Sequence, residues 1–361
     1  MASKFVILLS VLLLFLIFFL VTNQTKNNSN PNESYFDTVF DIPTIRKQQE
    51  ETSQELFGTK FETCKSIPIS NSQGLILDSA IVCHVTREIP SSRQPTFYYE
   101  IYPENCIQDS YFFVNLDYTD FQKLLSDPKS PKNVLCKTGQ TYNIIKSYLP
   151  YKNVIYTGFT SIDRFLPSLS SAKNYRSFIH IAGKSPHKGT SHVINAWLNH
   201  PEWPAITLIC REDLLKNIHH VIPKIKNAQN INLIDRFLPE KKLIEYMNHN
   251  GVHICSSEFE GFGHYINEAR STEALVLYTN GEPMKEMFTD GVNGIAISSV
   301  RGSPTNRSIC PTYLVSPQSV EVAVQKTLKM SENELRDMGK KARQAFLEND
   351  KKFRERLLLL F

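Results

Sequence analysis

The strongest restriction on the fold is a regular alternation of short apolar runs and helical patterns, which is clearest from residue 171 onward. The runs are continuous and rich in β-forming residues, as in strands that are buried on both faces of a sheet. We expect strands at Phe178–Ala182, Ala205–Cys210, Ile231–Ile234, Val252–Cys255 and Leu275–Thr279, and helices near Thr190–Leu198, Pro239–Asn248 and His264–Ala274. This alternation predicts a parallel, doubly wound α/β sheet.

The preceding residues predict a second α/β domain, which is short. Its candidate elements are a helix at Gln140–Tyr148 and strands at Leu75–Cys83, Phe97–Tyr102, Tyr111–Asn115, Asn133–Cys136 and Asn153–Thr157. The polar stretch Ser168–Tyr175 divides the two halves. A chain of 361 residues accommodates two domains, which we place at residues 56–170 and 171–345.

The segment from Val320 to Phe361 has helical periodicity. Its expected core contacts are Phe346, Leu347, Phe353 and Leu357. Membrane contact by the apolar end, Leu357–Phe361, is the alternative interpretation.

The N-terminus carries an uncharged apolar run, Phe5–Val21, after a tail of residues 1–4. As a helix it would span ~26 Å, which suits the thinner membranes of the secretory pathway. The run lacks the small-residue cleavage pattern of a signal peptide, so we favour an uncleaved anchor, with a cleaved signal peptide as the alternative. Residues 22–55 are polar and predict a flexible stem. We therefore expect a single-pass type II membrane protein facing the Golgi or ER lumen, and its Asn-x-Ser/Thr triplets suit a glycoprotein.

Charge and cysteine content exclude other classes of protein. A formal charge of +4, without a basic stripe, gives no indication of nucleic-acid binding. The seven cysteines contain no Cys-x-x-Cys spacing, which disfavours a zinc site. Cys136, Cys210 and Cys255 end apolar runs and are expected to be buried. A disulfide among Cys64, Cys83 and Cys106 is left open.

The loop after the strand Phe178–Ala182 runs from Gly183 to Thr190. Thr190 is expected to cap the next helix, whose free N–H groups and dipole favour an anion. Lys184 and Lys188 flank that position and can hold a diphosphate. Alternatively, the two lysines only face solvent.

The loop after the strand Val252–Cys255 is richer in functional residues. Gly261 and Gly263 allow the backbone to approach a ligand closely. Glu260 precedes the helix and Glu268 lies about one turn inside it, so the two carboxylates can bind different hydroxyl groups of one extended ligand. The alternative is a glycine turn with two surface glutamates.

Here the sequence resembles the retaining GT-B glycosyltransferases, specifically family 4. Glu260 and Glu268 fit the Glu-x7-Glu signature of that family, and the first of them opens Glu-Gly-Phe-Gly. Other segments resemble family segments in the same order: Gly158–Phe165 with Asp163, Gly183–Gly189, Asn232–Tyr246, Leu275–Glu286 and Asp290–Gly294. The resemblance implies a GT-B fold of two Rossmann-like domains facing a cleft. Residues 346–361 would then form a helix that returns to the first domain.

By this resemblance Glu268 binds the ribose of a nucleotide-sugar donor, and Glu260 contacts the donor sugar near the reacting face. The other donor-binding residues implied are Gly183, Gly261, Phe262, Gly263, His264 and Glu282. Lys184 and Lys188 would stabilise the leaving diphosphate. No Asp-x-Asp motif occurs, so we expect no metal and no cofactor.

Two departures concern the phosphate loop and the acceptor side. Lys184 and Lys188 are four residues apart, where the family has Arg and then Lys five residues later. The first domain lacks the usual Gly-Gly loop and a clear family histidine, which leaves His84 and Asp117 as weak candidates.

The resulting hypothesis is a membrane-anchored hexosyltransferase that acts on a glycan, protein or lipid acceptor with retention. A catalytically inactive relative that binds glycans or nucleotides is the alternative, and a GT-B sugar-nucleotide epimerase is a third interpretation.

Overall fold

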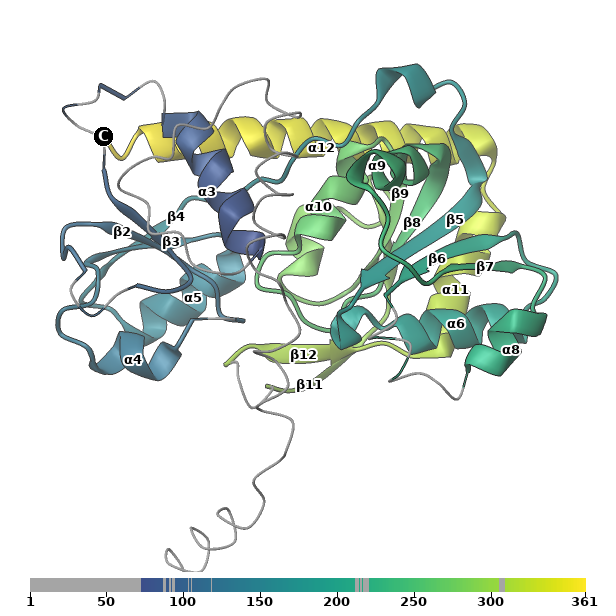
Figure 1. The fold of residues 1–361 in the computed structure, drawn as a ribbon, viewed down its shortest axis with the longest axis horizontal. Coiled ribbons are helices and arrows are strands. Elements are labelled where there is room, and N and C mark those ends of the chain that lie inside the picture. The colour runs from purple at the N-terminus through teal and green to yellow at the C-terminus, as the bar shows by residue number, and fades with distance from the viewer. Residues whose placement is uncertain are drawn as a thin grey trace, which may run out of the picture. The chain divides into compact units, whose positions relative to one another are not determined.

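A computed structural model describes residues 73–361 except 87–88, 91, 93–94, 103, 105, 118, 212–213, 215, 217–220 and 305–308, and these residues belong to one compact unit (Figure 1). The predicted tail, membrane span and stem, residues 1–55, lie outside the described residues, as does Cys64. Within the described part, no helix is long and apolar enough to cross a bilayer.

The larger sheet has six parallel strands in the order β10-β9-β8-β5-β6-β7. The strands are β5 (Asn174–Gly183), β6 (Ile206–Cys210), β7 (Ile231–Ile234), β8 (Asn250–Cys255), β9 (Leu275–Thr279) and β10 (Ile295–Ile297). The order is that of a doubly wound sheet, and the winding direction reverses between β5 and β8. The predicted parallel sheet is therefore confirmed, and its ligand-binding edge is expected at the carboxyl ends of β5 and β8.

Helices cover both faces of this sheet because alternate strand residues face opposite sides. In β9, Leu275 and Leu277 pack into a core with α6 (Thr190–Asn199) and α11 (Pro317–Leu328). Val276 and Tyr278 pack on the other face against α10 (His264–Ser271). The remaining elements are α8 (Ile222–Asn227), α9 (Glu240–His249) and the unpredicted hairpin of β11 (Val300–Pro304) and β12 (Pro311–Leu314). We call Asn174–Leu328 the second lobe.

The smaller sheet has four parallel strands in sequence order: β1 (Phe97–Tyr99), β2 (Tyr111–Val114), β3 (Asn133–Cys136) and β4 (Asn153–Tyr156). Its helices are α3 (Gln73–Thr86), α4 (Phe121–Ser126) and α5 (Gly139–Tyr148). We call Gln73–Tyr156 the first lobe. Two parallel-sheet lobes, the first of them short, are what the sequence predicted, and the predicted strands that are present match to within four residues at each end.

One predicted strand of the first lobe is wrong, because Leu75–Cys83 lies inside α3. A short apolar run does not by its periodicity distinguish a buried helix from a strand. In the structure, Ile81, Val82 and Val85 lie on one side of α3 and pack with Phe97 of β1. Tertiary packing of a helix face therefore decided the outcome.

The C-terminal helix α12 (Glu332–Leu358) contacts both lobes. It begins at a capping box in which Ser331 and Glu334 satisfy each other's backbone groups. Leu335 and Met338 pack into the core of the second lobe, whereas Phe353 and Leu357 pack into the core of the first lobe. The end of α12 thus packs on the first lobe, and the helix starts at Glu332 rather than near residue 346.

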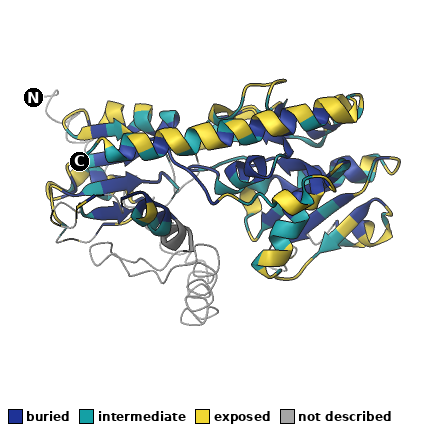
Figure 2. Cartoon of the chain, turned by 90° about the horizontal axis from the view of Figure 1, so that it is seen from above, coloured by how far each residue is buried: buried dark blue, intermediate teal, exposed yellow. Residues whose placement is uncertain are grey.

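Leu347, predicted to be in the core, is 46% exposed, while its neighbour Phe346 is buried. Consecutive helical residues point about 100° apart, so only one of the two can face the lobes. Figure 2 shows exposed and buried residues alternating along α12.

The cysteine predictions are partly tested. Cys136, Cys210 and Cys255 are buried, as predicted. Cys83 and Cys106 do not form a disulfide with each other.

Candidate active site

The two loops that the sequence singled out meet at the reversal point of the larger sheet. The loop after β5 contains the 3-10 turn η3 (Pro186–Lys188). The Ser256 hydroxyl donates to the Lys188 carbonyl (2.8 Å), and the Glu258 N–H donates to the His187 carbonyl (2.8 Å). Gly189 has a left-handed φ of 64°, and a Cβ there would press against Ser256. The two loops therefore pack against each other as one unit.

Two helix N-termini open onto this unit. Gly189 precedes α6 and Gly263 precedes α10, both in the left-handed conformation, with no side-chain cap from the described residues. The predicted cap by Thr190 is wrong, because its hydroxyl pairs instead with Nε2 of the buried His180 (3.0 Å). Burial lowers the pKa of His180 to about 4, so the imidazole is neutral. The uncapped N–H groups are left for an anion.

Lys188 and Glu260 form an ion pair at the centre of the loop unit. The Lys188 ammonium also lies 3.5 Å from the centre of the Tyr265 ring. The Ser257 hydroxyl donates to the Glu260 carboxylate (2.6 Å) and so fixes its orientation. The structure thus joins two of the three predicted catalytic residues, while the third, Lys184, is exposed.

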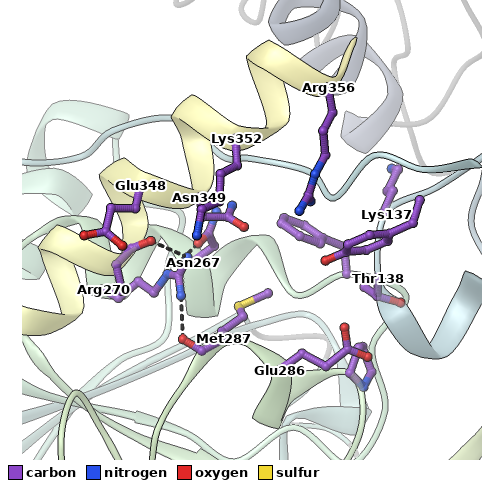
Figure 3. A pocket seen from close by; sticks show the side chains of 14 residues that line it. Lys137, Thr138, Asn267, Arg270, Glu286, Met287, Glu348, Asn349, Lys352 and Arg356 are labelled. Carbon is purple, nitrogen blue, oxygen red and sulfur yellow. Dashed lines mark hydrogen bonds between the residues drawn. The ribbon is translucent and has the colours of Figure 1, made fainter. Parts of the chain in front are cut away.

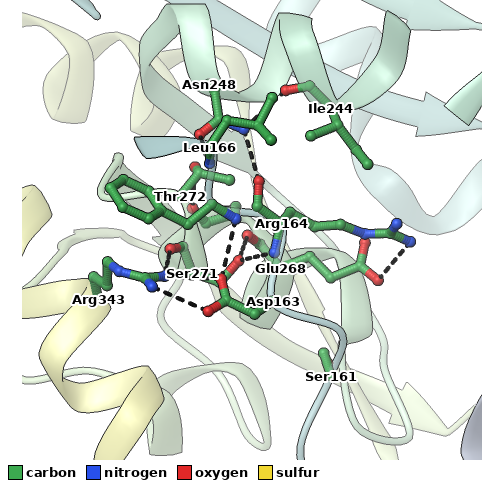
Figure 4. A network of polar contacts seen from close by, with 12 residues as sticks. Ser161, Asp163, Arg164, Leu166, Ile244, Asn248, Glu268, Ser271, Thr272 and Arg343 are labelled. Atoms are coloured by element: carbon green, nitrogen blue, oxygen red, sulfur yellow. Dashed lines mark hydrogen bonds and ion pairs between the residues drawn. The ribbon is translucent and has the colours of Figure 1, made fainter. Parts of the chain in front are cut away.

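The second motif carboxylate, Glu268, pairs with a different cation. Arg164 Nη2 lies 3.4 Å from Glu268 Oε1, and Arg164 also pairs with Glu240 at the start of α9. Figure 4 shows Arg164 reaching from the connection between the lobes towards Glu268 on α10. Because Glu260 and Glu268 pair with separate cations, they are placed for different parts of one ligand.

The connection between the lobes is held on both sides of Arg164. The Asn248 side chain accepts from the Leu166 N–H (2.9 Å) and donates to the Arg164 carbonyl (2.7 Å). Asp163 accepts two bonds from Arg343 of α12, at 2.8 and 3.0 Å (Figure 4). Arg164 was missed in the sequence, where only Asp163 was noted, although the two are adjacent.

The first lobe contributes Asp117, which follows β2. A Cβ on Gly261 would overlap the Asn115 side chain and lie 2.9 Å from Asp117 Oδ2, so glycine is required for this close approach. Asp117 lies against the Gly261 backbone, which partly offsets the rise in its pKa that burial causes. Its Oδ1 is buried and has no hydrogen-bond partner among the described residues. Burial, together with the Glu260 charge, raises the pKa of Asp117 to about 7.

A network of buried charged side chains lies close to Asp117. Lys137, at the end of β3, pairs with Asp78 of α3 and lies 3.7 Å from Glu100. Glu100 accepts from Asn115 Nδ2 (2.6 Å) and has the rare φ of 57° for a residue other than glycine. Burial raises the pKa of Asp78, but Lys137 and His264 outweigh this effect and hold it below the ordinary value. Sequence reasoning missed this network because its members lie on four separate elements.

His264, predicted to bind the donor, uses both ring nitrogens for other contacts. Its Nδ1 lies 2.9 Å from Ser161 Oγ, and its Nε2 lies 2.9 Å from Asp78 Oδ1. The other predicted donor-binding aromatic, Phe262, is buried and packs edge-on against Phe159. Both side chains therefore contact the first lobe or the connection between the lobes.

The remaining predicted residues lie at the margins of the site. Gly183 ends β5 with a left-handed φ of 57°. Glu282 is 40% exposed and pairs with Lys285 (3.1 Å). Within the described ranges, no cluster of His, Cys, Asp and Glu is arranged to hold a metal ion.

Comparison with known proteins adds a family and a set of folds. Residues 161–345, half of the chain, match the family model described as glycosyl transferases group 1. The search of curated proteins gave no match to the sequence.

Three solved structures illustrate the likeness of fold. Anabaena Alr3699/HepE in complex with UDP-glucose is 16% identical, covers 82% of this chain and 78% of its own, and has a TM-score of 0.53. Sucrose-phosphate synthase of Thermosynechococcus elongatus is 11% identical, covers 79% and 77%, and has a TM-score of 0.58. The pneumococcal O-GlcNAc transferase GtfA in complex with UDP and GlcNAc is 19% identical, covers 72% and 51%, and has a TM-score of 0.53.

Proposed function

Since the chain belongs to the group 1 glycosyl transferases and has a GT-B-like α/β fold, we propose that it transfers a hexose from a nucleotide-sugar donor to a hydroxyl acceptor with retention of anomeric configuration. The observation that carries this proposal is the Lys188–Glu260 pair at the point where two uncapped helix N-termini converge. A cation and two helix dipoles at one place suit a leaving diphosphate, whose negative charge grows in the transition state.

Each side chain has a role in this proposal. Glu268 accepts the ribose hydroxyls and Glu260 accepts sugar hydroxyls, as ionised carboxylates do well. Lys188, with the more exposed Lys184, neutralises the diphosphate, so that no metal is required. These two lysines and the backbone N–H groups supply the charge stabilisation that a metal ion gives in other enzymes.

Asp117 is the acceptor-side group of the proposed reaction. The acceptor oxygen bonds to the anomeric carbon on the same face from which the diphosphate leaves, so that the configuration is retained. The bond from that carbon to the phosphate oxygen breaks, and its electron pair leaves with the diphosphate. The acceptor proton passes to the Asp117 carboxylate. A carboxylate with a pKa of about 7 is matched to accepting a proton at neutral pH.

Turnover of a panel of nucleotide sugars tests the proposal, beginning with uridine diphosphate sugars because two of the similar structures hold UDP. We expect release of nucleoside diphosphate and transfer to one acceptor class. Lys188→Ala should lower the rate by about 10²–10³-fold, whereas Lys340→Ala, an exposed residue of α12, should not. Donor binding by the wild-type chain without release or transfer over the whole panel would favour the inactive relative instead.

We also propose that residues 5–21 anchor the protein as a single-pass type II membrane protein of the ER or Golgi. The supporting observation is the uncharged apolar run at this position. Cell fractionation should place the full chain with membranes and a chain lacking residues 1–21 in the soluble fraction. Recovery of both chains in the soluble fraction would contradict the anchor.

A further inference from the structure

A pocket of about 280 Å³ lies between α12 and the loops of both lobes, next to the candidate active site. Figure 3 shows Lys352 and Arg356 on the lower side of α12, above Glu286 of the 3-10 turn η4 (Met284–Met287). Phe262, which follows Glu260 and Gly261 in the loop after β8, forms part of its wall. A group bound here would therefore lie against the loop that carries Glu260, the carboxylate that we propose contacts the donor sugar.

The charged lining of this pocket is mainly basic. Four basic side chains, Lys137, Arg270, Lys352 and Arg356, face two acidic ones, Glu286 and Glu348. Both Glu286 oxygens are already engaged, since they accept from the Gly139 and Gln140 N–H groups at the start of α5 (2.7 Å each). Lys137 is already paired with Asp78, so the lining cations without a carboxylate partner among the described residues are Arg270, Lys352 and Arg356.

Arg270 is the clearest case of uncompensated charge. It is buried, and its guanidinium donates only to neutral oxygens, those of Asn267, Met287 and Ala345. Within the described part of the chain, no carboxylate lies within ion-pairing distance of it. Burial lowers the pKa of Arg270 to about 10. A buried cation without an anion carries a desolvation cost that an anionic ligand would offset.

The two cations from α12 are also available. Arg356 stacks on the Tyr156 ring (4.9 Å) and has no carboxylate partner among the described residues. Lys352 is exposed and makes no hydrogen bond or ion pair with the part of the chain described. Both are long, flexible donors that can close on a small anion, and an arginine fork suits phosphate or carboxylate.

We propose that this pocket binds an anionic group, phosphate or carboxylate, of the acceptor. The proposal rests on the proposed glycosyl transfer, because the acceptor is defined by that reaction. It assigns the substrate class: the hydroxyl that receives the sugar belongs to a molecule with a negatively charged group close by. The volume suits one such group with its attached carbons rather than a larger ligand.

The test compares two double variants of α12, Lys352→Ala with Arg356→Ala and, as the matched control, Lys341→Ala with Lys351→Ala. The control removes two exposed lysines of the same helix that do not line the pocket. Glycerol 3-phosphate and glucuronate, titrated by calorimetry at fixed ionic strength, serve as phosphate and carboxylate probes. Nucleotide affinity is measured in parallel on the same proteins.

We expect the wild type and the control to bind at least one probe, and the pocket variant to lose about tenfold or more in affinity, as for the loss of a charge-assisted hydrogen bond. Nucleotide affinity should stay within about twofold in all three. The preferred probe identifies which anion the acceptor carries. Transfer to an acceptor bearing that anion should fall in the pocket variant and in neither other protein.

Three results would overturn the inference. The first is that the wild type binds neither probe, and the second is that both double variants bind the probes as the wild type does. The third is that the pocket variant loses nucleotide affinity by the same factor as probe affinity, which would assign the pocket to the donor diphosphate. Failure of the proposed function can be distinguished from these results, because it would be seen as an absence of turnover by the wild type, whether or not the probes bind.

Discussion

The two lobes bring functional groups to their junction by different physical means. The second lobe uses two adjacent loops, two helix N-termini and the local pair Lys188 and Glu260. The first lobe uses side chains from α3, β1, β2 and β3, joined through the buried Lys137. The second lobe is thus built for binding a charged ligand through its backbone, whereas the first lobe holds one carboxylate, Asp117, in a fixed and dry position.

This contrast has an energetic consequence. Backbone N–H groups at a helix start are unpaired in any helix, so leaving them for a ligand adds little cost to folding. Buried ionised side chains must be paired and hydrogen-bonded, because removing one partner leaves an uncompensated charge. Mutations in the first lobe should therefore mainly lower stability, whereas mutations in the second lobe should mainly lower ligand affinity.

The largest expected effect is on stability, from Lys137→Met in the first lobe. Without Lys137, the buried carboxylates of Asp78 and Glu100 lose their shared cation. We expect this loss to lower the free energy of unfolding by about 3–5 kcal/mol. Denaturant titration measures it. Lys132→Met, at the other end of β3, removes a surface pair with Asp109 and should cost no more than about 1 kcal/mol.

Adding Asp78→Asn to Lys137→Met should recover part of the lost stability, since both members of the buried pair are then neutral. If the double variant loses as much stability as the two single variants together, the pair is not energetically coupled. The stability of the first lobe would then not depend on this buried pair.

A smaller effect is expected for Glu268→Ala in the second lobe, this time on affinity. Loss of a carboxylate that accepts ribose hydroxyls should weaken nucleotide binding by about 10–100-fold. Calorimetry with a ribonucleotide and its 2′- and 3′-deoxy analogues isolates the contact. The wild type should bind at least one deoxy analogue more weakly than the ribonucleotide, whereas Glu268→Ala should bind that analogue and the ribonucleotide equally well. Glu245→Ala, on the surface of α9, should behave as the wild type does.

If Glu268→Ala retains the full discrimination between the ribonucleotide and both analogues, Glu268 does not bind the ribose. The second lobe would then bind the nucleotide through other groups, and Glu268 would serve only to hold Arg164.

The smallest expected effect has the opposite sign. The pKa of Asp117 in the folded protein, about 7, lies above its ordinary value of 3.8. Its contribution to stability is therefore present below pH 3.8 and is lost as the pH rises through 7. Asp117→Asn should raise the melting temperature at pH 8 by about 2–4 °C, and by less at pH 5, while transfer falls.

Thermal unfolding at the two pH values, with Asp109→Asn as the exposed control, measures this shift. Transfer by the wild type should rise with pH through 7, as the carboxylate ionises. A variant that is less stable at pH 8 but fully active would show that Asp117 is a structural residue only.

The sequence predicted the second lobe well because its signals are local. Continuous apolar strands, the spacing of Glu260 and Glu268, and the glycines between them can all be recognised in short windows. The first lobe was predicted less well, for two reasons. The run Leu75–Cys83 fits a helix or a strand until its partners are known, and Asp117 stands in no motif.

The sequence by itself determined the two parallel sheets, the loop pair at the reversal point and the two motif carboxylates, because side-chain periodicity and loop chemistry act between near neighbours. Only the tertiary structure decided that Arg164 holds Glu268, that Asp117 meets Gly261, and that α12 closes a basic pocket over both lobes. These contacts join residues far apart in the chain. Their strength depends on burial and on the nearby charges, and both exist only once the chain has folded.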